Sequence, residues 1–209
     1  TDSWTVDAPR ADDALPLFAL AIPEFPEQPT FGTWLTSEAE AQTLARFSGR
    51  PLLVYYTFPD CPRCQLMQPY FDDPATRKLL GRFVLLKVAF TDRVPPALAR
   101  FAAPNSPFLL MPALVISTST QTLGPAYELS SKDDVQEVIG LWDSAAKGVM
   151  QPISEDAFED SVAVFSEIEV RLSQGDYEAV LDELSWIARL DERYQTAFAD
   201  LARQTTQGI

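Results

Sequence analysis

The chain has 209 residues, 46% of them hydrophobic, which suits one ordinary domain with an appendage or two small domains. Its formal net charge of −14 argues against a surface for nucleic acid or anionic membrane, because both need clustered Lys and Arg. With two cysteines and no histidine, the chain has no means of building a Ser-His-Asp or Cys-His hydrolase or any His-ligated zinc or haem site.

Residues 1–31 are expected to form a proline-rich extended arm. Five prolines block any long helix in this segment: Pro9, Pro16, Pro23, Pro26 and Pro29. The sequence starts at Thr1 rather than at a methionine. If a signal peptide was removed upstream, the mature protein is extracytoplasmic, and we favour that location over the cytoplasm. No apolar run is long enough to predict a membrane span.

Residues 32–148 are expected to form an α/β domain, and its first two elements are well marked. Thr36 or Ser37 can cap a helix that extends to about Phe47 and ends at Gly49. The run Leu52–Phe58 is a continuous stretch of residues that favour β-strands, and nearly all of them are hydrophobic. Such a run is typical of a strand that is buried on both faces of a sheet.

The two cysteines, Cys61 and Cys64, follow this strand after a turn at Pro59-Asp60. Residues 63–81 then have the pattern of one helix, which we expect to be kinked at Pro69 because a proline ring displaces the carbonyl four residues earlier. The apolar residues at helical spacing in this segment are Leu66, Met67, Tyr70 and Phe71.

The rest of the domain alternates between strands and helices. We expect strands at Phe83–Phe90, Ala113–Ser117 and about Ala126–Leu129, a short helix from Pro95-Pro96 to about Phe101, and a helix from Ser130 or Ser131 to Lys147. The order βαβα followed by ββα predicts a small mixed sheet flanked by helices.

Residues 154–207 are expected to form an all-α extension at the C-terminus. One helix starts at Ser154 and ends near Gly175, a second extends from Asp176 to about Leu190, and a third extends from Asp191 to about Gln204. The middle helix has an apolar stripe made of Val180, Leu181, Leu184 and Ile187.

The Cys61-Pro62-Arg63-Cys64 motif points to thiol–disulfide exchange. Cysteines at this spacing can close a disulfide within the first turn of a helix, whose N-terminus favours thiolate over thiol at Cys61. Cys61 is then the attacking thiol, and Cys64 resolves the mixed disulfide. Arg63 favours the thiolate, Asp60 opposes it, and Pro62 stiffens the turn. We expect both sulfurs at the exposed head of the helix.

Two other interpretations of the pair stay open. A structural disulfide would close a loop of only four residues, which stabilises a fold by roughly 2 kcal/mol, against about 3 kcal/mol for fifteen residues. A zinc site would need two more soft ligands, which only another chain could supply. We favour redox exchange, with no metal and no cofactor other than the Cys61–Cys64 disulfide itself.

From about Phe31 to Gly148 the chain resembles the thioredoxin-like family. The resemblance is carried by a Cys-x-x-Cys after a buried strand, by Pro69 five residues after the second cysteine, and by Met111-Pro112 before a strand. It implies a thioredoxin fold, with a mixed central sheet flanked by helices, and the activity of a thiol–disulfide oxidoreductase. The stretches 64–74 and 83–88 are similar to the branch that includes the C-terminal domain of bacterial thiol:disulfide interchange proteins.

The resemblance also implies a substrate site. Pro112 corresponds to the cis-proline of the family, which faces the cysteines and binds the substrate backbone. The groove would lie between Cys61 and the Met111-Pro112 loop, with Phe58 and Phe108 as apolar contacts.

Two positions depart from the family pattern. Asp60 stands where a tryptophan usually precedes the first cysteine, and Tyr55 stands where many members bury a proton-accepting acid. A neutral tyrosine is a poor base near pH 7, so deprotonation of Cys64 would rely on solvent or on Lys87. Burial preferences favour Tyr55 as a core residue rather than a catalytic one.

The segment 174–191 is similar to a tetratricopeptide helix hairpin, which some thioredoxin-like co-chaperones carry after the redox domain. One hairpin cannot bury its own apolar stripe, so we expect it to pack on the thioredoxin-like domain or to bind a partner. The implied partners are protein thiol or disulfide substrates, or one dedicated redox partner. The alternative function is a binding module or co-chaperone whose helical tail captures a partner.

Overall fold

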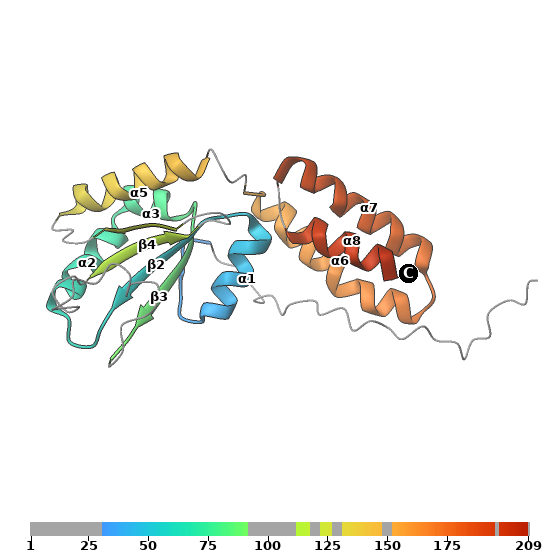
Figure 1. Ribbon diagram of the computed structural model, residues 1–209, viewed down its shortest axis with the longest axis horizontal. Helices are drawn as coiled ribbons and strands as arrows, with labels where there is room; N and C mark the ends of the chain where they lie inside the picture. The colour runs from blue at the N-terminus through green and yellow to red at the C-terminus, as the bar shows by residue number, and fades with distance from the viewer. Residues whose placement is uncertain are drawn as a thin grey trace, which may run out of the picture.

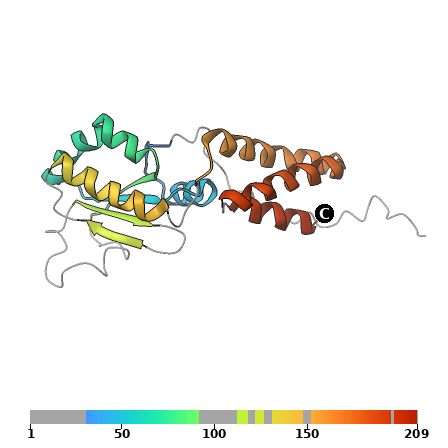
Figure 2. The same ribbon diagram turned by 90° about the horizontal axis from the view of Figure 1, so that it is seen from above.

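The computed structural model describes residues 31–91, 112–117, 122–126, 131–147, 152–194 and 197–208. These residues form a mixed sheet with helices packed against it and a bundle of three helices at one end of the sheet (Figure 1). The view from above separates the helices that cover the sheet from the bundle (Figure 2). Among the described helices, none is long and apolar enough to cross a membrane.

The sheet has five strands in the order β1-β3-β2-β4-β5. Their bounds are β1 Trp34–Leu35, β2 Leu52–Thr57, β3 Val84–Ala89, β4 Ala113–Ser117 and β5 Thr122–Ala126. β3 pairs parallel with β1 and with β2, whereas β4 pairs antiparallel with β2 and β5. All six residues of β2 are buried, as the apolar run predicts for the central strand. This mixed sheet flanked by helices is a thioredoxin fold, which confirms the predicted fold class.

Helix α1 (Glu38–Ser48) begins and ends where the sequence predicts. Ser37 caps it, because the Ser37 hydroxyl accepts a hydrogen bond from the Glu40 N–H at 3.3 Å. Gly49 ends it with φ of 67°, a left-handed conformation that favours glycine. α1 packs against β1, β2 and β3, and it lies on the opposite side of the sheet from α3 and α5 (Figure 1).

The single helix predicted over residues 63–81 is wrong, because the structure has two helices there. These are α2 (Pro62–Asp72) and α3 (Pro74–Leu80). The Asp73 carboxylate accepts hydrogen bonds from the N–H groups of Ala75 and Thr76, and Pro74 occupies the first turn of α3. An Asp-Pro pair is a helix start, since the side chain caps the new turn and proline needs no N–H partner there. Pro69 lies inside α2.

The sheet differs from the prediction at both edges. The two-residue strand β1 was not predicted, since two residues carry no periodic signal. β5 begins at Thr122, four residues before the predicted strand, and it contains Gly124-Pro125. β5 is an edge strand, where a proline is tolerated because one side of the strand needs no N–H donor. β4 has the predicted bounds, and the predicted helix at 95–101 lies outside the described residues.

Helix α5 (Lys132–Lys147) packs against α2 and α3. Ser131 and Asp134 cap it reciprocally: the Ser131 hydroxyl accepts from the Asp134 N–H at 3.2 Å, and the Asp134 carboxylate accepts from the Ser131 N–H at 3.0 Å. Val135 and Ile139 are fully buried on the inner face of α5, as the predicted apolar spacing requires.

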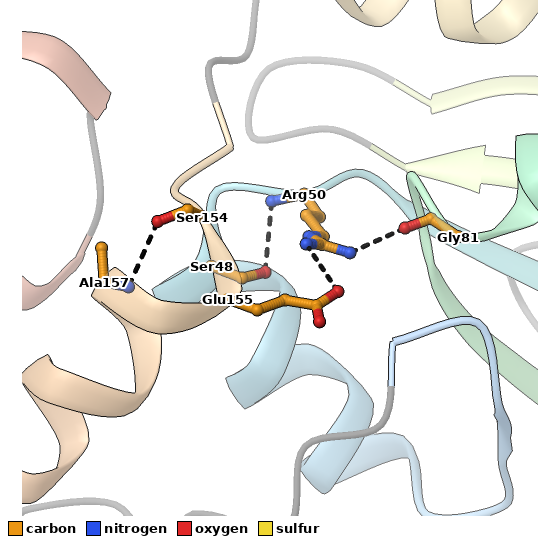
Figure 3. A network of polar contacts seen from close by, with 6 residues as sticks. All are labelled: Ser48, Arg50, Gly81, Ser154, Glu155 and Ala157. Carbon is orange, nitrogen blue, oxygen red and sulfur yellow. Dashed lines mark hydrogen bonds and ion pairs between the residues drawn. The ribbon is translucent and has the colours of Figure 1, made fainter.

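The C-terminal extension is helical, as predicted, and consists of α6 (Glu155–Ser173), α7 (Tyr177–Tyr194) and α8 (Ala197–Gly208). Ser154 caps α6 through its hydroxyl, which accepts from the Ala157 N–H at 3.2 Å (Figure 3). The predicted start of the third helix at Asp191 is wrong, because α7 extends to Tyr194. Asp191 has the residue type of a helix cap but lies inside a helix that continues past it.

The extension packs on the sheet part through aromatic rings and one backbone hydrogen bond. The rings of Phe47 in α1 and Phe198 in α8 have centroids 4.9 Å apart, and those of Phe31 and Phe158 are 5.8 Å apart. The Ile153 N–H donates to the Ser48 carbonyl at 3.1 Å. Of the two expectations for the tail, the structure therefore shows packing on the thioredoxin-fold part. The domain boundaries at residues 31/32 and 148/154 stay predictions.

Arg50 contacts three other segments at this junction, and Figure 3 shows its contacts with Gly81 and Glu155. Its Nη1 donates to the Gly81 carbonyl at 2.7 Å, its Nη2 lies 3.4 Å from a Glu155 carboxylate oxygen, and its guanidinium carbon is 3.5 Å from the Phe31 ring centroid. Burial lowers the pKa of Arg50, and Glu155 opposes that effect. Arg50 lies two residues before β2 and Gly81 lies three residues before β3. The extension is therefore attached where these strands begin, at the end of the sheet opposite to the cysteines.

Candidate redox-active site

The site begins where β2 ends. A turn from Phe58 to Asp60 leads from the strand into α2, and Asp60 has φ of 56°, in the left-handed region. Aspartate is one of the few residues other than glycine that adopts this conformation at low cost. The backbone therefore accounts for an aspartate at this position, which the family resemblance left as a departure.

Cys61 and Cys64 form a disulfide in the first turn of α2. The sulfur atoms are 2.05 Å apart, and the Cα atoms are 5.2 Å apart. Cys61 is the N-cap residue of α2, and its sulfur accepts a hydrogen bond from the Cys64 N–H at 3.1 Å. Pro62 follows in the first turn, where its missing N–H costs nothing. The Cys61 sulfur thus lies at the positive end of the helix dipole.

Both cysteines are buried, contrary to the expectation of exposed sulfurs. Cys61 is 3% exposed and Cys64 is 9% exposed, whereas Pro62 and Arg63 between them are exposed. Cys64 lies on the inner face of α2, which it shares with the buried residues Met67 and Phe71. The disulfide holds Cys61 against that face.

Tyr55 lies beneath the first turn of α2. Its hydroxyl donates a hydrogen bond to the Cys64 carbonyl at 3.1 Å, and its side chain is 2% exposed. Burial raises the pKa of Tyr55 to about 12, so the phenol is neutral near pH 7, as the sequence predicts. Sequence reasoning missed the contact with Cys64. The alternation of β2 could have indicated it, because every second residue of the strand faces α2.

Lys87 pairs in register with Tyr55 on the neighbouring strand β3, and its side chain is exposed. Residues paired in register on parallel strands point to the same face of the sheet. Lys87 therefore lies on the face that carries α2. Its predicted part in deprotonating Cys64 stays a prediction.

The predicted substrate contacts are only partly within the described residues. Pro112 is buried and directly precedes β4, whose first residue, Ala113, pairs with Tyr56 near the end of β2. Pro112 therefore lies at the same end of the sheet as the cysteines. Phe58 is half-buried. Met111 and Phe108 lie outside the described residues, and the cis configuration at Pro112 stays a prediction.

The exposed side of α2 carries one line of apolar residues among polar ones, which the sequence did not predict. Leu66 is 65% exposed, so it does not share the inner face with Met67 as its spacing suggested. Pro62, Leu66 and Pro69 have the spacing i, i+4 and i+7, and all three are exposed. They form a stripe along the helix that starts within the Cys-x-x-Cys motif. We call it the α2 stripe.

The charged residues beside the disulfide are Asp60 and Arg63. Both are exposed, and Arg63 makes no ion pair with any residue in the described ranges. Between Cys61 and Phe71 the sequence contains no acidic residue, although the whole chain has 30. In the part of the chain that the structure describes, no three Cys, His, Asp or Glu side chains are grouped to hold a metal ion.

A mixed sheet of this strand order, with a Cys-x-x-Cys disulfide in the first turn of the helix after its central strand, defines a thioredoxin-fold protein with a closed cysteine pair. Solved structures similar to the chain include a thioredoxin from Thermus thermophilus, with 22% identity over 56% of this chain and 91% of that chain and a TM-score of 0.46. The first thioredoxin domain of mouse protein disulfide-isomerase A4 is 14% identical over 72% of this chain and 94% of that chain, with a TM-score of 0.40.

Thioredoxin f from spinach chloroplast is 16% identical over 55% of this chain and 92% of that chain, with a TM-score of 0.38. No family profile matches the chain, and no curated protein sequence matches it. The likeness to the interchange-protein branch and to a tetratricopeptide hairpin therefore stays a prediction.

Proposed function

We propose that the protein is a thiol–disulfide oxidoreductase that exchanges disulfides with protein substrates. The observation that carries the proposal is the Cys61–Cys64 disulfide at the N-terminus of α2, directly after the central strand. In the reducing direction, the Cys61 thiolate attacks a substrate disulfide, forms a mixed disulfide and releases one substrate thiolate. The Cys64 thiolate then attacks the Cys61 sulfur, which releases the second substrate thiolate and passes two electrons to the substrate.

A purely structural role is the weaker interpretation of the disulfide. Cys61 and Cys64 are three positions apart in the sequence, and the backbone of the first turn of α2 already holds them close together. A cross-link over so short a loop removes little entropy from the unfolded chain. The same position at a helix N-terminus favours the thiolate form that exchange needs.

A polypeptide substrate is supported by the α2 stripe. Exposed Leu66, with Pro62 and Pro69 on either side of it, gives an apolar contact next to the disulfide. Apolar surface buried on docking contributes about 25 cal/mol per Å². A small disulfide cannot cover this stripe, whereas the chain on either side of a protein cysteine can.

Insulin reduction with dithiothreitol as electron donor tests the proposal directly. We expect Cys61→Ser to abolish turnover and Cys64→Ser to accumulate a mixed disulfide that is visible on a non-reducing gel. Equal activity of wild type and Cys61→Ser would contradict the proposal.

The contribution of the α2 stripe is tested separately. Leu66→Gln should raise the KM for insulin about fivefold and leave the reduction of cystamine unchanged. Leu141→Gln is the matched control, because Leu141 is 63% exposed on α5. An equal effect of both substitutions would rule out docking on the α2 stripe.

The second candidate function, partner capture by the helical tail, is supported by charge and by an open groove. Residues 152–208 contain 13 acidic and 4 basic residues, so most of the net charge of the chain lies in the extension. An open groove of ≈ 390 Å³ between α6 and α7 is lined by Asp160, Ala163, Val164, Glu167, Glu183 and Trp186. Arg171 pairs with Glu167 and Glu183, so the excess of acidic residues in the whole extension is what favours a basic segment by charge complementarity.

Deleting the extension would expose Phe47, so a point substitution is the better test. Trp186→Ala in the full chain should abolish binding of a Lys-rich peptide and leave insulin reduction unchanged. A peptide that binds both proteins equally would contradict capture in this groove.

A further inference from the structure

The hydrogen bond from Tyr55 to Cys64 places a buried polar side chain directly under the redox pair. The donor and acceptor oxygens are 3.1 Å apart, and Tyr55 is 2% exposed. A phenol hydroxyl in such a place needs a partner, because an unsatisfied buried donor costs about 1–3 kcal/mol. The partner is a backbone carbonyl of the second cysteine, so the contact acts on the position of that cysteine.

The Tyr55 ring is held firmly. Its centroid is 5.7 Å from that of Trp34 and 5.1 Å from that of Phe71, and the Trp34 and Phe71 centroids are 5.2 Å apart. The three rings come from β1, β2 and α2, so they fix the helix against the strands. Tyr55 itself lies in the central strand, paired on both sides. Its hydroxyl therefore has a fixed direction toward the first turn of α2.

Both backbone polar groups of Cys64 make specific contacts. Its N–H donates to the Cys61 sulfur at 3.1 Å, and its carbonyl accepts from the Tyr55 hydroxyl. When the disulfide opens, the covalent link between the sulfurs is lost. The contact with Tyr55 does not involve either sulfur, and it can hold the Cys64 backbone in place in the reduced protein and in the mixed disulfide.

We propose that Tyr55 is a positioning residue for the resolving step: its hydroxyl, by donating to the Cys64 carbonyl, keeps the Cys64 sulfur within attacking distance of the Cys61 sulfur. This inference rests on the proposed function. In the step, a bond forms between the Cys64 and Cys61 sulfurs, the bond from Cys61 to the substrate sulfur breaks, and the substrate leaves as a thiolate. Displacements of about 1 Å can change the rate of such a step by about 100-fold.

Tyr55 acts here through geometry and not as a base. Its pKa of about 12 keeps the hydroxyl protonated, so it remains a donor during turnover. The charged group that shares its face of the sheet is Lys87, which is exposed. The resolving thiol therefore loses its proton to another acceptor, and removal of the Tyr55 hydroxyl should alter the rate of resolution without altering the first attack.

The test compares Tyr55→Phe with Tyr56→Phe in the full chain. Tyr56 is the next residue of β2, 7% exposed, and points to the opposite face of the sheet. Each reduced protein is mixed with an excess of dithiobis(2-nitrobenzoate) and quenched with acid, and the mixed disulfide at Cys61 is quantified by mass spectrometry. We expect Tyr55→Phe to prolong the lifetime of this mixed disulfide about tenfold and to leave the rate of the first attack unchanged within about twofold. Tyr56→Phe should match wild type in both.

Equal lifetimes in wild type and Tyr55→Phe would overturn the inference and leave the proposed function intact, since the mixed disulfide would still form and resolve. Absence of a mixed disulfide in wild type and in Cys64→Ser would instead contradict the proposed function. If Tyr55→Phe does not fold, proton NMR of the reduced wild-type protein replaces the comparison. The Tyr55 hydroxyl proton should exchange slowly with solvent and show a nuclear Overhauser effect to Cys64. Absence of this nuclear Overhauser effect would overturn the inference.

Discussion

The ring of Phe47 in α1 meets the ring of Phe198 in α8, with centroids 4.9 Å apart and planes inclined by 63°. Phe198 also contacts Phe158 and Phe165 in α6, so it lies between the bundle and the sheet part. One hydrophobic core continues from the sheet part into the bundle through this ring, so the stability of the extension and that of the thioredoxin-fold part are coupled.

The chain is therefore expected to unfold in one transition. Phe198→Ala should lower the free energy of unfolding by about 3–5 kcal/mol, since it leaves a cavity shared by both parts. Urea unfolding followed by far-UV circular dichroism and by tryptophan fluorescence gives the measurement. Two separate transitions in wild type would show that the parts are independent.

Arg50 is expected to contribute more to stability than its ion pair alone. Arg50→Ala should cost about 2–3 kcal/mol, because it removes the donor to the Gly81 carbonyl and the contact with Phe31. Glu155→Ala should cost less than about 1 kcal/mol, since the Glu155 side chain is 62% exposed. Arg77→Ala, which breaks the exposed pair with Asp72, is the control and should also cost under about 1 kcal/mol. Equal losses for Arg50→Ala and Arg77→Ala in chemical denaturation would be inconsistent with this role.

Tyr55 should make the protein sensitive to alkali. Its pKa is about 12 in the folded protein and about 10 in the unfolded chain, so the folded state retains its proton where the unfolded state loses it. The stability is fully present below pH 10 and falls by about 2–3 kcal/mol as the pH rises to 12. Burial raises the pKa of Tyr56 as well, which adds an effect of the same sign. In urea titrations between pH 9 and 12, Tyr55→Phe should show a shallower decline than wild type. Parallel curves would refute this assignment.

Burial of the disulfide should slow its reaction with small thiols. Attack on a disulfide requires a thiolate to approach one sulfur, and Cys61 and Cys64 are only 3% and 9% exposed. Reduction of the oxidised protein by dithiothreitol should therefore accelerate in urea concentrations well below the unfolding midpoint. Tryptophan fluorescence follows the reaction. A rate that is unaffected by urea would mean that burial does not limit access.

Local sequence signals predicted the elements whose ends are marked by side-chain chemistry. Ser37 and Gly49 define α1, and the apolar run after Pro51 defines β2. The predicted helix boundaries were wrong where an aspartate can either cap a new helix or lie inside a continuing one. Asp73 starts a new helix because Pro74 follows it, whereas Asp191 has no such neighbour and lies within α7. Leu66 has the spacing of a core residue but faces outward, since helical spacing does not tell which face meets the sheet.

The sequence by itself determined the chemistry of the protein: two cysteines with two residues between them, one of these a proline, and a buried strand before the pair. These features are local, because the four residues 61–64 decide whether two sulfurs can bond in one helical turn. Only the tertiary structure decided that the sulfurs are buried, that the Tyr55 hydroxyl reaches the Cys64 carbonyl, and that the bundle is attached at the end of the sheet opposite to the cysteines. Such contacts join residues from different elements, and their positions depend on how the whole core packs.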